Sequence, residues 1–150
     1  LDRSIADEVE AAIKAGSAEK HLETFRRVTE LFLATVDGCG DEQIELFGDV
    51  LERLMKTLDL RALADVSARI ALAEMSTQLA SVKQAPPGVI RRLARHDEIT
   101  IARPVLTESA RLTPEDLVEL AETKGEQHLL AISGRWWLNE VVISSLPPPA

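Results

Sequence analysis

The sequence is poor in aromatic residues: Phe and Trp make up 3% of its 150 residues, and Tyr does not occur. It has a single cysteine, Cys39, which cannot form a disulfide within the chain and therefore favours a reducing compartment. No apolar run approaches the roughly 20 residues that a membrane helix requires. We therefore expect a cytoplasmic protein that has no membrane-spanning helix.

Basic residues are scarce relative to acidic ones. The chain has 17 Lys and Arg against 25 Asp and Glu, which gives a formal net charge of −8 at pH 7. An excess of negative charge repels phosphate backbones and anionic lipids. Nucleic acid and membrane surfaces are therefore disfavoured as partners.

The residues that are abundant indicate a folded helical protein. Hydrophobic residues account for 45% of the chain and charged residues for 28%, a balance typical of globular domains. Leu, Ala, Glu and Arg dominate, and all four are strong helix formers. A chain of this length is usually one domain with its own core. The composition therefore predicts an all-α protein that folds as one continuous domain.

Helical periodicity of apolar residues predicts four helices in the first part of the chain. Asp41 and Asp59 stand where each could cap one of the later two helices. The predicted helices span residues 2–15, 17–36, 41–58 and 60–83. We interpret residues 1–84 as an N-terminal bundle of longer helices or as degenerate repeats.

The second part of the chain contains a recurring helix start. Residues 85–93 (APPGVIRRL), 112–120 (LTPEDLVEL) and 138–146 (LNEVVISSL) align with offsets of 27 and 26. Partner helices are predicted between these starts, at residues 98–108 and 126–134. Helical hairpins that repeat at this length must stack to bury their apolar faces, as in an α-solenoid.

Local signals place the starts of these helices. In the middle copy, Thr113 is predicted as the N-cap, Pro114 as the first helical residue and Asp116 as its N3 partner. Asp97 is predicted to cap the helix at residues 98–108. Pro104 falls inside that helix, so we expect a kink or a late start there.

Three stretches resemble a known family. They are DEI-x-IA-x-PVL at residues 97–106, L-T-x-E-D-L at 112–117 and HLLAIS-x-R at 128–135. Together they resemble a bacterial family named domain of unknown function 2336, which is similar to HEAT repeats. The stretch QIELFGDVLERL at residues 43–54 extends the resemblance, to about residues 41–146. The resemblance implies a fold and no activity.

With the repeat, the resemblance predicts a HEAT-like α-solenoid of short hairpins at residues 85–146, preceded by the longer packed helices of residues 1–84. Residues 147–150, Pro-Pro-Pro-Ala, are interpreted as a linker or a truncation point. Because the chain starts at Leu1 without a Met, it is interpreted as a piece of a longer protein.

Residue types that carry chemistry cluster at His96, Asp97 and Glu98. With His128 they could supply metal ligands, but no second His or Cys stands at a ligand-like spacing. The alternative is structural: Asp97 caps a helix and His96 lies in a turn. We therefore predict no metal and no cofactor, and keep an enzyme with a site near His96 or His128 as an alternative function.

Cys39 lies between two glycines, where a thiol is expected to be exposed. Its acidic neighbours Asp37, Asp41 and Glu42 disfavour a thiolate, and no Lys or Arg stands beside it. The sequence also lacks a G-x-S-x-G elbow and a Gly-rich phosphate loop. No catalytic residue is predicted.

Two further groups are candidate partner-binding residues. Arg91, Arg92 and Arg95 form the only basic cluster; such a helix face can bind DNA or phosphorylated peptides, or it can simply be solvated beside neighbouring acids. Arg135-Trp136-Trp137 has the composition of an interface hot spot, although the two Trp rings could instead cover the end of the last repeat.

The sequence thus predicts a non-catalytic module for protein binding or scaffolding, whose partner it does not identify. Self-association is one form that such binding can take. An enzyme on a helical-repeat scaffold and nucleic-acid binding through the arginine helix are the alternatives.

Overall fold

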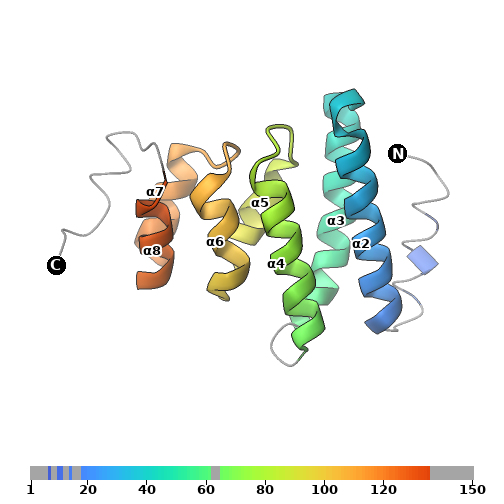
Figure 1. Cartoon of the computed structure of the whole chain (residues 1–150), viewed down its shortest axis with the longest axis horizontal. Coiled ribbons are helices and arrows are strands. Elements are labelled where there is room, and N and C mark those ends of the chain that lie inside the picture. The colour runs from blue at the N-terminus through green and yellow to red at the C-terminus, as the bar shows by residue number, and fades with distance from the viewer. Residues whose placement is uncertain (1–6, 8–9, 12–13, 15–17, 62–64, 136–150) are drawn as a thin grey trace.

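The computed structural model describes residues 7, 10–11, 14, 18–61 and 65–135 (Figure 1). Within these residues all regular structure is helical and no strand occurs, which confirms the all-α prediction. The elements are α2 (Ala18–Thr35), the 3₁₀ helix η1 (Val36–Gly38), α3 (Asp41–Arg61), α4 (Val66–Ala80), α5 (Pro87–Ala94), α6 (Ile99–Glu108), α7 (Pro114–Thr123) and α8 (Glu126–Ser133).

The helices lie in two rows along the long axis of the molecule (Figure 1). In the row nearer the viewer, α2 packs against α4, α4 against α6 and α6 against α8. Behind it, α3 packs against α5, and α7 pairs with α8 at the far end. Most helices therefore contact their sequence neighbours and the next helix of their own row, whereas α7 contacts mainly α8.

One continuous cluster of buried apolar side chains joins the rows, from Leu22 in α2 to Ile132 in α8. Most of its members are aliphatic, as the low aromatic content requires. The exceptions include three Phe side chains of α2 and α3, Phe25, Phe32 and Phe47, and the rings of Phe32 and Phe47 meet edge to face with centroids 5.2 Å apart. The division of the chain at residue 84 stays a prediction.

The predicted start of the fourth helix at Asp59 is wrong. Helix α3 continues to Arg61, because nothing in this stretch interrupts the helical pattern and Leu and Arg favour helix. Helix α4 instead follows Asp65, whose carboxylate accepts a hydrogen bond from the Ser67 N–H at 2.9 Å, and it ends at Ala80. Asp59 is thereby left free to pair with other parts of the fold.

Two other predicted caps also differ from the structure. Asp41 is the first residue of α3 rather than its cap, since the Ile44 N–H donates to the carbonyl of Gly40. Glu98, not Asp97, occupies the N-cap of α6. Pro104 lies inside α6, which starts at Ile99, so the alternative of a late helix start is wrong.

The capping signals of α7 are confirmed. The Thr113 hydroxyl accepts from the Asp116 N–H at 3.1 Å, the Asp116 carboxylate accepts from the Thr113 N–H at 3.0 Å, and Pro114 opens the helix. Helices α5 and α7 start 27 residues apart, and so do α6 and α8. The third predicted start at residues 138–146 and most of the predicted helix at 2–15 lie outside the described residues.

Candidate functional site

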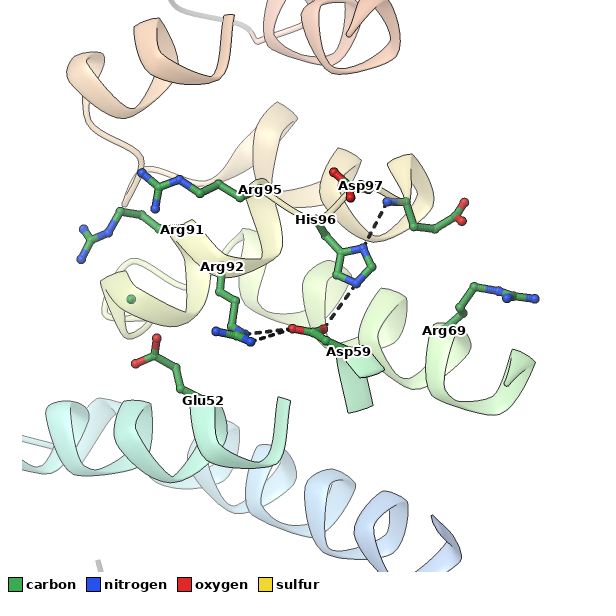
Figure 2. Close-up of a pocket in the computed structure, with 10 residues that line it drawn as sticks. Glu52, Asp59, Arg69, Arg91, Arg92, Arg95, His96 and Asp97 are labelled. Atoms are coloured by element: carbon green, nitrogen blue, oxygen red, sulfur yellow. Dashed lines mark hydrogen bonds and ion pairs between the residues drawn. The ribbon is translucent and has the colours of Figure 1, made fainter. Parts of the chain in front are cut away.

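A groove of about 670 Å³ lies where the end of α3, the start of α4, and α5 with the turn after it come together (Figure 2). It brings together the two clusters that the sequence analysis treated separately, the arginines of α5 and the residues around His96. Its lining residues are Glu52, Asp59, Arg69, Gly88, Arg91, Arg92, Arg95, His96, Asp97 and Glu98. Acidic and basic side chains are equal in number, so their arrangement decides what the groove can bind.

Asp59 lies at the centre of the groove, between Arg92 and His96 (Figure 2). Its Oδ2 accepts hydrogen bonds from Nε and Nη2 of Arg92, both at 3.0 Å. Its Oδ1 lies 3.3 Å from Nε2 of His96. All three side chains are less than one-third exposed, which strengthens these contacts relative to a pair in open solvent. Arg92 is therefore not part of a freely solvated face.

Both ring nitrogens of His96 are engaged. Nδ1 accepts a hydrogen bond from the Glu98 N–H at 3.1 Å, so the neutral ring carries its proton on Nε2, facing Asp59. A general base needs a free nitrogen lone pair, and in this arrangement His96 has none. The contact of Asp59 with His96 links the end of α3 to the turn before α6.

His128 does not line the groove. Its side chain is 5% exposed and its Nε2 lies 2.8 Å from the carbonyl oxygen of His96. Because a carbonyl only accepts hydrogen bonds, Nε2 of His128 is the donor. The two histidines are thus linked in space, but the link joins α8 to the turn before α6 and leaves the second ring inside the protein.

The three arginines of α5 have different surroundings. Arg92 pairs with Asp59 of α3, whereas Nη2 of Arg95 donates to Oε2 of Glu119 in α7 at 2.9 Å. Arg91 is half-buried and no hydrogen bond or ion pair engages its guanidinium in the described structure. In this basic cluster Arg92 therefore forms a partly buried ion pair, Arg95 forms a surface ion pair, and Arg91 forms neither an ion pair nor a hydrogen bond in the described structure.

Two of the remaining acids of the groove, Glu52 and Asp97, lie near positive groups. A Cβ added at Gly88 would lie 3.0 Å from Oε2 of Glu52, so this carboxylate sits against the first turn of α5, where the helix dipole favours it. The Asp97 carboxylate lies 2.7 Å from Nζ of Lys124. The hydrogen bond and the charge of Lys124 lower the pKa of the Asp97 carboxyl group below its ordinary value.

Arg135, a predicted partner-binding residue, is buried. Its Nη1 donates to the Leu106 carbonyl at 2.6 Å and its Nη2 to the Ser109 carbonyl at 2.5 Å, so it completes the C-terminal end of α6. Burial lowers the pKa of its guanidinium. Its partners lie more than 25 residues earlier in the sequence, so no local pattern could have revealed this role.

The rest of the predicted tryptophan site, Trp136 and Trp137, lies outside the described residues, and its part in partner binding stays a prediction. Cys39 is half-buried rather than exposed: it packs against the core, and its Sγ donates to the Thr35 carbonyl at 3.2 Å. Its expected exposure between two glycines is therefore wrong.

No group of three or more His, Cys, Asp or Glu side chains in the described ranges is placed to hold a metal ion. The helices of the described part are all too short or too polar to cross a membrane.

Fold and groove together define an all-α protein with a charged surface groove. Residues 101–147, from α6 through α8 and beyond, match the model of a family described as an uncharacterised protein conserved in bacteria, domain of unknown function 2336. This match confirms, for that stretch, the family predicted from the sequence. No curated protein and no solved structure matches the chain.

Proposed function

We propose that this chain is a non-catalytic protein-binding or scaffolding module whose hairpins stack as a HEAT-like α-solenoid. Support for the solenoid comes from the two rows of helices, because each unit of a solenoid contacts only its neighbours. Support for a repeated unit comes from the common offset of 27 residues between α5 and α7 and between α6 and α8. Solenoids commonly use their extended surfaces for binding.

The observation that carries the binding role is the engagement of the groove's reactive groups. Nδ1 of His96 accepts from the Glu98 N–H, and Oδ2 of Asp59 accepts from Arg92, with Nε2 of His96 3.3 Å from Oδ1 of Asp59. A groove whose histidine and central carboxylate are committed to the fold favours recognition over chemistry. This is why we place binding before the alternative of an enzyme near His96 or His128.

Exposed apolar side chains on α3 and α4, next in sequence to residues of the groove, give a second support. Leu60, which is 84% exposed, follows Asp59 in the chain, and Ile70, which is 48% exposed, follows Arg69. Val66 lies one turn before Ile70 on α4 and is 56% exposed. Exposed apolar groups next to polar and charged ones are typical of protein interaction sites.

Nucleic-acid binding through Arg91, Arg92 and Arg95 has less support. Two of the three arginines are already paired, with Asp59 and with Glu119. Helix α7, which Arg95 contacts, carries four acidic residues and no basic one. A nucleic acid needs several phosphate contacts along its backbone, and this surface would repel them on one side.

We also place the protein in the bacterial cytoplasm, since a chain with one cysteine suits a reducing compartment. Photo-crosslinking in the native host tests the binding role, with a photoreactive amino acid at Leu60 or Ile70 and at the exposed Gln127 of α8 as the control position. We expect crosslinked protein adducts at the first two positions only. Adducts of twice the chain mass would identify self-association.

Absence of any adduct at Leu60 and Ile70 would contradict the binding role at this face. The tryptophan site is tested separately, by the double substitution Trp136→Ala/Trp137→Ala. If the same crosslinked proteins are recovered in unchanged amount, the tryptophans are not part of the interface.

A further inference from the structure

Arg91 is a cation in the groove that the fold does not use. Its side chain is half-buried, which restricts it, yet no hydrogen bond or ion pair engages it in the described structure. Holding a guanidinium partly out of water without a partner costs free energy. That cost is recovered when an anion binds.

Arg95 lies one helical turn after Arg91, on the same side of α5. In Figure 2 both side chains extend to the same side of the helix, away from Asp59. Arg95 is 44% exposed and uses Nη2 for Glu119, so other N–H groups of its guanidinium remain available. The two guanidinium groups can thus act on one ligand.

The neighbouring carboxylates do not neutralise this pair completely. Asp59 is paired with Arg92 and Asp97 with Lys124, while Glu52 lies against Gly88 in the first turn of α5 and forms no ion pair with Arg91 in the described structure. Glu119 pairs with Arg95 at the exposed surface. The charge of Arg91 is therefore not paired with a carboxylate among the described residues, although the chain as a whole has a net charge of −8.

We propose that Arg91 and Arg95 bind a phosphate monoester on a partner protein, as carried by a phosphorylated Ser or Thr side chain. This inference rests on the proposed protein-binding function and specifies the chemistry of the partner. A phosphoryl group has nearly two negative charges and three acceptor oxygens, which match two guanidinium groups better than a carboxylate does. The acids of α7 restrict the site to a single anion, which favours one phosphorylated side chain over a nucleic acid.

Inorganic phosphate is the first probe. It is added to ¹⁵N-labelled protein at constant ionic strength while the arginine Nε–Hε signals are recorded. We expect the signals of Arg91 and Arg95 to shift and that of Arg103, an exposed arginine on α6, to stay in place. Equal shifts at all three arginines would overturn the inference, because they would indicate non-specific attraction only.

The second probe is a fluorescent heptapeptide with a central phosphoserine among Gly and Ser, compared with its unphosphorylated form by anisotropy. We expect only the phosphorylated peptide to bind, and the double substitution Arg91→Gln/Arg95→Gln to weaken binding by about tenfold or more, because it removes two charged donors. The matched control Arg103→Gln is expected to change nothing. Far-UV circular dichroism of each variant verifies that it is folded.

Three results would overturn the inference: equal binding of both peptides, unchanged binding by the double variant, or tighter binding of a short DNA duplex through the same arginines. Crosslinks at Leu60 and Ile70 that survive phosphatase treatment of the cell extract before irradiation would leave the proposed protein-binding function intact. In that case only the phosphate site would be wrong.

Discussion

Asp59 and Arg92 stand 33 positions apart in the sequence, and their side chains join the end of α3 to α5 inside the groove. Because both side chains are less than one-third exposed, this contact should contribute more than a surface ion pair. The first prediction concerns its strength.

A double-mutant cycle with Asp59→Ala and Arg92→Ala should give a coupling free energy of about 1–2 kcal/mol in urea unfolding, since two N–H groups of Arg92 reach one carboxylate oxygen. The matched cycle is Arg95→Ala with Glu119→Ala, whose side chains are 44% and 54% exposed. There we expect about 0.5 kcal/mol or less. Equal coupling free energies in both cycles would show that partial burial does not strengthen the contact of Asp59 with Arg92.

Removing the guanidinium of Arg135 should destabilise the protein strongly. In Arg135→Met the aliphatic packing is largely kept, but the carbonyls of Leu106 and Ser109 lose a charged donor inside the protein. We expect a loss of about 2–3 kcal/mol in the free energy of unfolding, measured in urea. Arg103→Met, at an exposed position of α6, serves as the control and should change little.

Hydrogen exchange adds a local measurement to this prediction. The amides in the last turn of α6 should exchange faster in Arg135→Met than in the wild type, by more than the amides of α3 do. A uniform change in all helices would indicate that Arg135 acts on global stability alone.

The close approach of α3 to Pro86 depends on Gly48. A Cβ at this position would lie 2.9 Å from Cβ of Pro86, and neither atom belongs to a flexible chain end. Overpacking typically costs about 1–3 kcal/mol, whereas Ala in place of Gly gains about 1 kcal/mol of helix propensity. Gly48→Ala should therefore lower the free energy of unfolding by about 1 kcal/mol.

Asp49→Ala is the natural comparison, because Asp49 is the next residue of α3 and is exposed. It gains helix propensity without meeting Pro86, so its melting temperature should equal or exceed that of the wild type. If Gly48→Ala is as stable as Asp49→Ala, the two segments can separate without cost and the close contact is unimportant.

The pair of Asp97 and Lys124 should make stability depend weakly on acid pH. The pKa of the Asp97 carboxyl group is lower in the folded than in the unfolded protein. The stability that the pair contributes is therefore present above the ordinary carboxyl pKa of about 3.9, and it is lost as the pH falls through the pKa of the folded state. Because Asp97 is highly exposed, we expect a small effect. The direct measurement is an NMR titration of the carboxyl carbon.

In Lys124→Met the titration midpoint of Asp97 should rise toward the ordinary value. An unchanged midpoint for Asp97 would show that the ion pair does not persist in solution. High salt should reduce the difference between the two proteins.

The elements that the sequence predicted correctly are those with local signals. The capping box of Thr113 and Asp116 joins residues three positions apart. The starts of α5 and α7 are each marked by a proline in the first helical position, so their offset could be read from the sequence. Asp59 misled the prediction because an Asp beside a helical run is typical of an N-cap. Its actual partner, Arg92, lies 33 positions away, so the local sequence does not reveal the pairing.

The groove could be predicted only in pieces. Arg91, Arg92 and Arg95 were visible as a basic cluster and His96 as a polar one, but their meeting with Glu52 and Asp59 depends on how α3 packs against α5. The role of Arg135 at the end of α6 gave no local signal, since its side chain reaches back to a carbonyl 29 residues earlier in the sequence.

The backward reach of Arg135 also bears on the order of folding during synthesis. The carbonyls at the end of α6 leave the ribosome more than 25 residues before the guanidinium that satisfies them. A nascent chain that stops short of Arg135 therefore carries an incomplete α6, even though every residue of that helix has been made. The hairpin of α5 and α6 is thus finished only after α8 has been made, so its maturation runs one hairpin behind translation.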